Sequence, residues 1–334
     1  MQRGGREITC LGIESTAHTF GVAIASSHGG ILSDVNSKYS PLPGKGIHPR
    51  EAAQHHSEVA PIVLRDSLEK WGRPLDGIDV VAFSAGPGLG PVLRTGATMA
   101  RALASWLDVP LVLVHHAIAH IEIAAYMTGA KDPLVALVSG GHTTVTAFKG
   151  GRWQIFGETE DITLGNLLDM FARAVPLQTP GGPEVEKLAS LGTVFLDLPY
   201  VVKGNDVSYS GLLTATKRLL SSGAALEDVC YSLQEMAFAM LAEAVERALA
   251  HTEKNELLLT GGVAANSRLR EMLRIVAEDH GAEILVVPRE YSGDSGAQIA
   301  WTGILAFSAG LKTEIERSFV KPRWRLDSVD TPWR

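Results

Sequence analysis

The sequence has few cysteines, no excess of basic charge and no long apolar run, and each absence excludes a class of protein. Only two cysteines occur in 334 residues, Cys10 and Cys230, so we expect no disulfide framework and a reducing, cytoplasmic location. No apolar run reaches the roughly 18 residues of a membrane span. The first residues also lack the apolar core of a signal peptide. We therefore expect an intracellular protein without a membrane partner.

The charge balance is acidic. A formal net charge of −7 argues against a chain that binds nucleic acid by itself through a broadly basic surface. One basic stretch remains at Arg317–Arg325. Its cations alternate with Phe319 and Trp324, and no acid intervenes: Arg317, Lys321, Arg323 and Arg325. Such a stretch is either a local nucleic-acid contact or, more commonly, a packed and solvated terminus.

The apolar segments repeat between the two halves of the chain. Two apolar strands around a polar turn predict a hairpin at Ile8–Ala25, and the same plan recurs at Leu134–Phe148. A strand, a glycine-containing loop and a helix follow at 78–106 and again at 256–278. Internal duplication of an α/β unit is the economical explanation. We expect two closely packed lobes, one formed by residues 1–130 and 300–334 and the other by residues 131–299.

Three other segments have recognisable patterns. Ser232–His251 places apolar residues at helical spacing, which predicts a core helix whose methionines are packing residues. Glu51–Trp71 predicts another helix. We expect three of its polar residues to form a solvated face and not a ligand set: His55, His56 and Glu58. Tyr39–His48 contains two prolines and two glycines, which predicts a long and mobile loop.

A histidine pair is the first candidate for a metal site. His116 and His120 are four residues apart in a predicted helix, so their imidazoles share one face. Zinc or ferrous iron accepts two such ligands if a third comes from elsewhere, although two ordinary histidines near a helix start are an alternative. Zinc peptidases carry a glutamate beside the first histidine as general base, but residues 117–119 are Ala, Ile and Ala. Glu122 lies on a different helix face, so peptide hydrolysis is disfavoured.

Several glycine-rich loops are candidates for ligand binding. Ser139–Thr143 resembles the phosphate-binding hairpin turns of ATP-using enzymes, where backbone N–H groups and hydroxyls contact phosphate oxygens. It matches neither a Walker A loop nor Gly-x-Gly-x-x-Gly, so a Rossmann site is unsupported. The loops at 86–90 and 261–266 each join a strand to a helix. Glycine there allows either close approach to a ligand or simply a tight turn.

Three acids occur in further loops of this kind. Asp169 and Glu186 can accept hydrogen bonds from ribose hydroxyls, and Asp294 can be a hard oxygen ligand to a metal. The alternative for each is a helix cap or a first-turn acid. The number of glycine-rich loops exceeds what turns alone require, which favours ligand binding.

Seven ordered motifs span essentially the whole chain: Gly12-Ile13-Glu14-Ser15-Thr16, Gly86-Pro87-Gly88-Leu89-Gly90, His116-Ala117-Ile118-Ala119-His120, Val138-Ser139-Gly140-Gly141, Pro180-Gly181-Gly182-Pro183, Tyr209-Ser210-Gly211-Leu212 and Gly261-Gly262-Val263-Ala264-Ala265-Asn266. With these motifs the sequence resembles the threonylcarbamoyladenosine tRNA transferase family, formerly described as O-sialoglycoprotein endopeptidases. The family comprises TsaD in bacteria and the catalytic subunit of the KEOPS complex in archaea and eukaryotes. The turn at 15–21 and the stretch at 321–325 resemble the archaeal and eukaryotic branch.

The resemblance implies an α/β, duplicated two-lobed actin/Hsp70/sugar-kinase-like (ASKHA) fold with a nucleotide cleft between the lobes. It implies metal-dependent transfer of the threonylcarbamoyl group from threonylcarbamoyl-AMP to the tRNA adenosine adjacent to the anticodon, without a nucleophilic side chain. The implied partners are a small atypical protein kinase and the dimerising subunit of a KEOPS-type complex, which would grip tRNA jointly with this chain. A small-molecule kinase of the same fold and an ATP-binding scaffold without its own chemistry remain alternatives.

The resemblance also implies the ligands of the site. One divalent metal, iron or zinc, would be held by His116, His120 and Asp294. ATP or an adenylate would be bound by Leu137, Val138, Ser139, Gly140, Gly141, Asp169, Gly182, Glu186, Gly261, Gly262 and Asn266. Two positions depart from archaeal relatives: Leu137 replaces a frequent tyrosine ligand, and Ser295 replaces the asparagine of Asp-Asn-Gly. We therefore expect water or a substrate phosphate to complete the metal shell.

Overall fold

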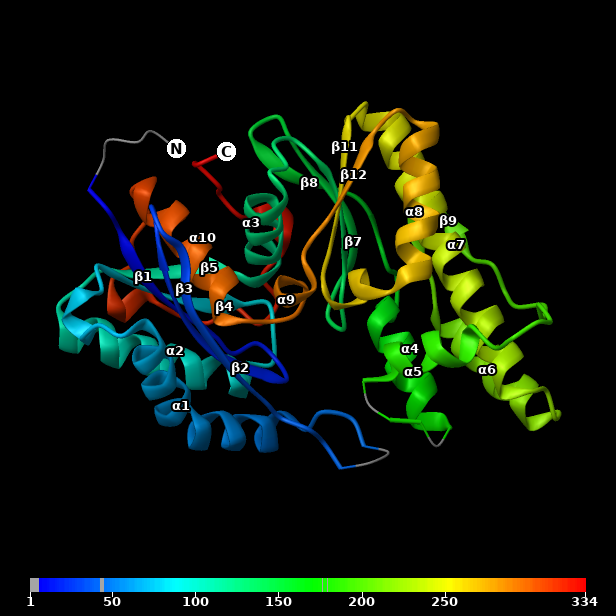
Figure 1. Cartoon of the computed structure of the whole chain (residues 1–334), viewed down its shortest axis with the longest axis horizontal. Helices are drawn as coiled ribbons and strands as arrows, with labels where there is room; N and C mark the ends of the chain where they lie inside the picture. Colours follow the sequence, from blue (N-terminus) through cyan, green and yellow to red (C-terminus); the bar gives the residue numbers. More distant parts are fainter. Residues whose placement is uncertain (1–5, 43–44, 176, 179) are drawn as a thin grey trace. The chain divides into compact units, whose positions relative to one another are not determined.

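The computed structural model describes residues 6–42, 45–175, 177–178 and 180–334, which divide into two compact units (Figure 1). The first unit comprises described residues of Met1–Pro41, Gly46–Ile123 and Asp294–Arg334, and the second those of Leu42–Lys45 and Ala124–Gly293. The units differ from the predicted lobes at residues 42 and 45, at 124–130 and at 294–299. Helix α3 (His116–Thr128) passes from one unit to the other, and Asp294 lies beside its histidines.

The first unit contains a five-stranded sheet in the order β3-β2-β1-β4-β5. Its strands are β1 (Thr9–Glu14), β2 (Thr19–Ser26), β3 (Gly30–Lys38), β4 (Val80–Gly86) and β5 (Leu111–His115). β1, β2 and β3 pair antiparallel, whereas β1, β4 and β5 pair parallel. The hairpin predicted at Ile8–Ala25 is therefore confirmed.

Helices cover both faces of this sheet, which explains why β1, β2 and β4 are fully buried. Gly12 packs against Ala300 of α10 (Gly296–Ser308), whereas the next residue, Ile13, contacts Gly96 of α2 (Gly90–Leu107). Successive strand residues point to opposite faces. Helix α1 (Pro49–Trp71) lies beside α2 on the same face (Figure 1).

The second unit repeats this arrangement in the sheet order β8-β7-β6-β11-β12. Its strands are β6 (Leu134–Val138), β7 (Thr143–Lys149), β8 (Arg152–Glu158), β11 (Glu256–Thr260) and β12 (Glu283–Val286). β6, β7 and β8 pair antiparallel, whereas β6, β11 and β12 pair parallel, as in the first unit. The predicted α/β duplication is confirmed, because strands in the same positions have the same neighbours and directions.

The remaining elements complete the two units. The second unit has the helices α4 (Leu164–Ala174), α5 (Gly181–Ala189), α6 (Ser210–Ser221), α7 (Leu226–Thr252), α8 (Ser267–Asp279) and α9 (Arg289–Ser292), and the short strands β9 (Val202–Lys203) and β10 (Asp206–Val207). In the described part of the chain, 3-10 turns occur at Leu75–Gly77, Gly262–Ala265, Ile315–Arg317 and Leu326–Ser328. The predicted core helix is confirmed within α7. Among the described residues, no helix is both long and apolar enough to cross a membrane.

One prediction about α1 is wrong. His56, expected on a solvated face, is fully buried and packs edge to face against Phe20 of β2, with ring centroids 5.5 Å apart. It lies on the same helix face as the buried residues Ala52 and Ala60, because residues four apart point the same way. Burial and the neighbouring His55 lower the pKa of His56 to about 4. Residues 43–44 of the predicted mobile loop at Tyr39–His48 lie outside the described residues.

Candidate metal centre

Three side chains of the first unit converge at one point. Strand β5 ends at His115 and α3 begins at the next residue, so His116 and His120 occupy the first two turns of this helix. Asp294 lies two residues before α10. One potential ligand atom of each residue lies within 4.8 Å of the other two. Nε2 of His120 is 3.1 Å from Oδ1 of Asp294, and Nε2 of His116 is 3.5 Å from the same oxygen. Two imidazole nitrogens and one carboxylate oxygen suit zinc or iron.

Glu14, at the end of β1, fixes the orientation of His116. Its fully buried carboxylate accepts a hydrogen bond at Oε2 from Nδ1 of His116, at 3.0 Å. Its other oxygen, Oε1, accepts from the backbone N–H and the hydroxyl of Thr16, at 2.7 and 2.5 Å. A carboxylate oxygen accepts, so Nδ1 is the donor to Glu14 and Nε2 is the nitrogen turned toward Asp294. A carboxylate behind a histidine in this way is typical of metal sites.

Gln298, in α10, lies against both imidazoles. Its Nε2 is 3.5 Å from Nδ1 of His116 and 3.5 Å from Nε2 of His120, and its side chain is fully buried. Its Oε1 has no hydrogen-bond partner within the described part of the chain. The side chain that contacts both imidazoles therefore also carries a buried acceptor, which a metal-bound water could satisfy.

The charges of the site also favour a cation. Burial opposes the charged form of His116, but the carboxylates of Glu14 and Asp294 outweigh it and raise its pKa to about 10. Burial lowers the pKa of His120. Burial alone would raise the pKa of Asp294, but the two histidines hold it well below its ordinary range. Two carboxylates beside one cationic ring leave negative charge in a buried place, which a divalent cation would neutralise.

Glu122 faces away from the histidine pair, as predicted. Its carboxylate accepts hydrogen bonds from Nε1 of Trp333 at 3.0 Å and from the guanidinium of Arg334 at 2.7 and 2.8 Å. The Glu122 and Arg334 side chains are only 5% and 12% exposed. Glu122 therefore binds the last residues of the chain to α3 and is not a general base for the pair.

The predicted nucleotide residues all lie in the second unit, beginning at the turn between β6 and β7. The hydroxyl oxygen of Ser139 accepts hydrogen bonds from the amides of Gly141 and His142, at 3.2 and 3.0 Å. Gly140 and Gly141 are exposed, and a Cβ at either position would meet no atom within 4 Å. Leu137 and Val138 are buried in β6. The turn therefore leaves free space beside its two glycines, so that a phosphate could approach the backbone closely.

The loop after β11 lies against this turn. Gly261 has a φ of 95°, and a Cβ there would lie 2.3 Å from the carbonyl oxygen of Val138, so only glycine fits. A Cβ on the next residue, Gly262, would meet nothing within 4 Å. Asn266 is the N-cap of α8 and accepts hydrogen bonds from the amides of Arg268 and Leu269, at 2.9 and 3.1 Å.

Asp169 and Glu186 both cap other helices. Oδ1 of Asp169 accepts a 2.7 Å hydrogen bond from the amide of Gly181, the first residue of α5. Oε1 of Glu186 accepts from the amide and hydroxyl of Ser267, the first residue of α8, at 2.8 and 2.5 Å. The capping alternative therefore describes both acids. Their contacts with ribose, and that of the half-buried Gly182 with a nucleotide, stay predictions.

Two residues of the site were not predicted from the sequence. Glu14 occurs in one of the motifs that carry the resemblance, and an acid at the end of an apolar strand is a signal that could have singled it out. Gln298 lies in a helix whose neighbouring residues are almost all buried, and no local pattern distinguishes it from a packed polar residue.

Solved structures similar to this chain share its fold. HypF from T. kodakarensis matches with a TM-score of 0.61 and 17% identity, over 89% of this chain and 47% of that one. Component A of the (R)-2-hydroxyglutaryl-CoA dehydratase of Acidaminococcus fermentans matches with a TM-score of 0.55 and 15% identity, over 89% and 97%. At these identities the likeness concerns the fold alone, and it confirms the predicted ASKHA type.

Sequence relatives are much closer. The tRNA N6-adenosine threonylcarbamoyltransferase of Thermofilum pendens is 57% identical over 332 residues, which are 99% of this chain and 98% of that protein. The protein of the same name from Methanopyrus kandleri is 54% identical over 97% of this chain and 96% of its own length. A family model described as TsaD, tRNA N6-adenosine threonylcarbamoyltransferase, matches residues 30–301. The chain therefore belongs to the tRNA N6-adenosine threonylcarbamoyltransferase (TsaD) family.

Proposed function

We propose that this chain transfers the threonylcarbamoyl group to N6 of a tRNA adenosine, with His116, His120 and Asp294 as its metal ligands. Family membership supports the reaction. The assignment of the metal site rests on the convergence of these three side chains beside Glu14. Oε2 of Glu14 lies 3.0 Å from Nδ1 of His116. The donor is threonylcarbamoyl-AMP, and the acceptor is the adenosine adjacent to the anticodon.

The reaction joins N6 of adenosine to the carbamoyl carbon, breaks the bond between that carbon and the phosphate oxygen of AMP, and releases one proton from N6. The amine is a poor nucleophile, whereas AMP is a good leaving group. Positioning and stabilisation of oxygen charge are therefore the main tasks, and no nucleophilic side chain is needed. A divalent cation, iron or zinc, would supply Lewis-acid stabilisation of that charge when bound.

The chain's own residues would perform the positioning. Glu14 accepts the proton of Nδ1 in a hydrogen bond, so Nε2 is the nitrogen of His116 that would bind the metal in place of its own proton. In the second unit, the open backbone at Gly140 and Gly141 would bind the phosphate of ATP or the adenylate, and Gly262 would allow the nucleotide to approach the loop after β11. The helix caps formed by Asp169, Glu186 and Asn266 hold the elements around these loops.

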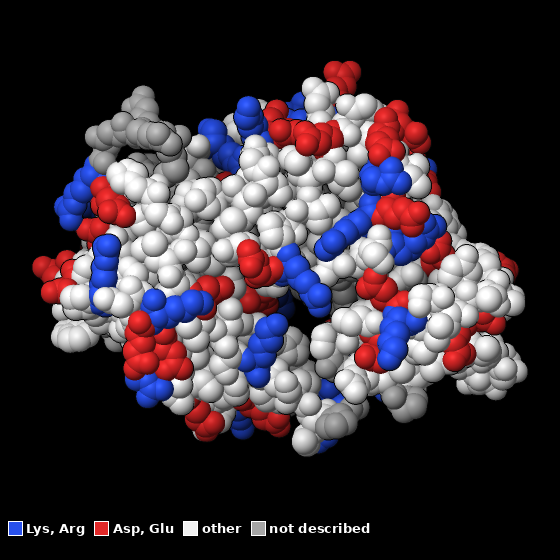
Figure 2. Space-filling view, viewed as in Figure 1, with Lys and Arg blue, Asp and Glu red and all other residues white. Residues whose placement is uncertain are grey.

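Partner proteins would contribute part of the affinity for tRNA. The net charge is −7, and on the face drawn in Figure 2 basic and acidic side chains are interspersed. We propose a KEOPS-type assembly in the cytoplasm, with a small atypical protein kinase and a dimerising subunit. By itself the chain is expected to bind tRNA weakly and with a steep salt dependence.

The test is reconstituted transfer to tRNA, with partners added one at a time and bound metal measured by mass spectrometry. His116→Ala is expected to lose the metal and to reduce transfer at least about 100-fold, since a ligand is removed from a three-ligand site. His28→Ala is the matched control, because His28 is exposed in the β2–β3 turn. Full transfer with undiminished metal in His116→Ala would refute the site.

Two other outcomes would replace the proposed function. Phosphoryl transfer to a sugar or carboxylate would identify a small-molecule kinase of the same fold. Nucleotide binding without tRNA modification, when threonylcarbamoyl-AMP and all partners are supplied, would identify an ATP-binding scaffold.

A further inference from the structure

The basic stretch Arg317–Arg325, which we name the strap, is fastened to the first unit along its length. Several hydrogen bonds hold it, among them Arg101 Nε to Ser318 Oγ at 2.8 Å, Lys321 N to Ala85 O at 2.6 Å, Gly88 N to Pro322 O at 3.1 Å, and His115 Nε2 to Trp324 O at 3.1 Å. Its backbone is thus packed, as expected of a packed terminus. A packed backbone presents its side chains in defined positions.

Its exposed cations gather with one from α2. Lys321 and Arg323 are exposed and make no ion pair within the described residues, whereas Arg325 pairs with Asp327 at 3.1 Å. Arg94, on α2, is also exposed; its guanidinium and the ring of Pro322 both lie within 4 Å of the Cβ position of Gly90. Four exposed cations for which the described residues offer no carboxylate partner therefore lie on or beside the strap: Arg94, Arg317, Lys321 and Arg323.

An exposed aromatic ring accompanies these cations. Phe319 is 68% exposed, although its neighbour Ser318 is fully buried. Nζ of Lys321 lies 4.1 Å from the centroid of the Trp324 ring, so this cation is held over an apolar surface. Exposed aromatic rings beside cations are typical of surfaces that bind unpaired nucleotides and their phosphates.

The Gly86–Gly90 loop contacts both the strap and Thr16 of the β1–β2 turn. A Cβ on Gly86 would lie 2.0 Å from the carbonyl oxygen of Lys321, on the strap side. A Cβ on Gly88 would lie 2.8 Å from the carbonyl oxygen of Thr16, on the other side. Thr16 is bound to Glu14, which holds the candidate ligand His116. A polyanion on the strap would therefore be anchored close to the metal centre.

We infer that Arg94, Lys321 and Arg323 form a phosphate-contacting surface for tRNA, with Phe319 placed to stack on an unpaired base. The inference rests on the proposed function, which requires a tRNA base to reach the metal centre. Because the whole chain is acidic, only a local group of unpaired cations can attract the phosphate backbone. Phosphate contacts of this kind set the position of the RNA and not its sequence preference.

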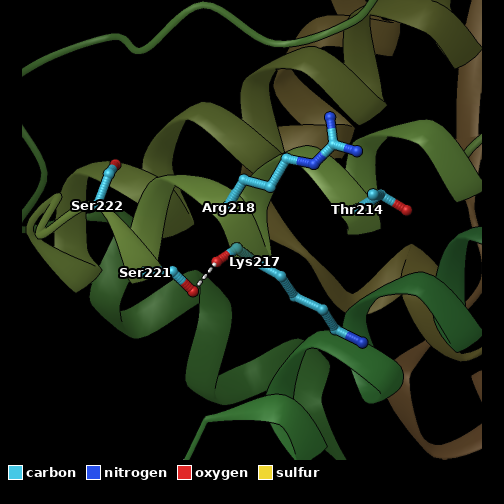
Figure 3. Close-up of a pocket in the computed structure, with 5 residues that line it drawn as sticks. All are labelled: Thr214, Lys217, Arg218, Ser221 and Ser222. Carbon is cyan, nitrogen blue, oxygen red and sulfur yellow. Dashed lines mark hydrogen bonds between the residues drawn. The ribbon is translucent and has the colours of Figure 1, made fainter.

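A second basic surface patch offers a matched control for the strap. Lys217 and Arg218 of α6, in the second unit, line a hollow of about 480 Å³ with Thr214, Ser221 and Ser222. Figure 3 shows the two cations pointing in different directions from the helix, so they do not converge on one phosphate. Both are exposed, as Lys321 and Arg323 are.

The experiment compares two charge reversals, Lys321→Glu with Arg323→Glu and Lys217→Glu with Arg218→Glu, which change the net charge equally. The dissociation constant of an unmodified tRNA transcript is measured by filter binding against salt, with the full chain and with the reconstituted complex. The strap variant is expected to bind at least about tenfold more weakly and to lose about two units of slope in log K against log salt. The α6 variant is expected to change by less than about twofold.

Transfer kinetics complete the test. The strap variant is expected to raise the KM for tRNA, while kcat, the KM for threonylcarbamoyl-AMP and the metal content stay unchanged. The neutral variant Lys321→Gln with Arg323→Gln is expected to lose an intermediate amount of tRNA affinity, which separates a charge effect from misfolding. The measurement of tRNA binding needs no transfer, so failure of the proposed function and failure of this inference are distinguishable.

Three outcomes would overturn the inference. Equal losses in the strap and α6 variants would show a response to net charge alone. Unchanged tRNA affinity with loss of complex assembly would assign the strap to a protein partner. An unchanged salt slope in the neutral variant would show that its cations do not contact phosphates.

Discussion

The hairpin turns of the two duplicated units occupy the same place in their sheets but differ in chemistry. In the first unit, the β1–β2 turn has Ser15 and Thr16 buried, and the Thr16 amide donates to the carboxylate of Glu14. In the second unit, the β6–β7 turn has the hydroxyl of Ser139 at its centre, and Gly140 and Gly141 are exposed. A turn that closes on its own carboxylate repels an anion, whereas open glycines and a hydroxyl admit one.

The strand-to-helix loops differ in the same sense. In the first unit, the Gly86–Gly90 loop is covered on one side by Thr16 and on the other by the strap at Lys321. In the second unit, Gly261 lies close to Val138, but Gly262 is open. A duplicated topology therefore does not imply duplicated chemistry. One copy supports a candidate metal centre, and the other keeps backbone available for a ligand.

The largest effect on this comparison is expected from Glu14→Gln. This change keeps an acceptor for Nδ1 of His116 but removes the negative charge, so metal affinity should fall by about 10–100-fold. The affinity is measured by competition with a chromophoric chelator, apart from any activity. Glu58→Gln, an exposed acid on α1, is the control and should leave the affinity unchanged. Equal metal affinity in Glu14→Gln and the unchanged protein would mean that the first turn does not support the metal.

The next prediction compares alanine at a covered glycine of the first unit with alanine at an open glycine of the second. Gly88→Ala places a Cβ 2.8 Å from the carbonyl oxygen of Thr16 and should lower the free energy of unfolding by about 2–3 kcal/mol. Gly140→Ala meets nothing within 4 Å and should change it by less than about 0.5 kcal/mol. Urea unfolding measures both values.

Nucleotide titration of the same variants sharpens the contrast. Gly140→Ala should weaken ATP binding, because a methyl group stands where the phosphate would approach the backbone. If Gly88→Ala is as stable as the unchanged protein, the first loop is not covered as described. If Gly140→Ala binds ATP with full affinity, the second turn does not hold the phosphate.

The smallest expected effect is on the stability of the protein at acid pH. It arises from His56, a residue of the first unit. The pKa of His56 is lowered to about 4 in the folded chain, so the unfolded chain binds the proton more readily. The stability due to the neutral ring is therefore present above about pH 6.5 and is lost as the pH falls toward 4. The unchanged protein should therefore lose more unfolding free energy than His56→Leu when the pH falls over this range, because leucine binds no proton. The expected difference is about 1–2 kcal/mol after a discount for solvent screening. The measurement is urea unfolding at pH 7 and pH 4.5, and an unchanged difference between the two would contradict it.

Much of the fold was predictable because its signals are local. The hairpins at Ile8–Ala25 and Leu134–Phe148 follow from apolar runs around polar turns, and α7 follows from helical spacing. The burial of His56 was not predictable in this way. A polar residue on a partly solvated helix becomes buried only when the neighbouring strand places Phe20 against it.

The sequence by itself determined the elements, the repeat and the shared helix face of His116 and His120, because each depends on residues close together in the chain. Only the tertiary structure decided which distant residues join them. Asp294 lies 174 positions from His120, and Glu14 lies 102 positions from His116. Their approach depends on the packing of β1, α3 and α10 around one sheet, and no local pattern encodes that packing.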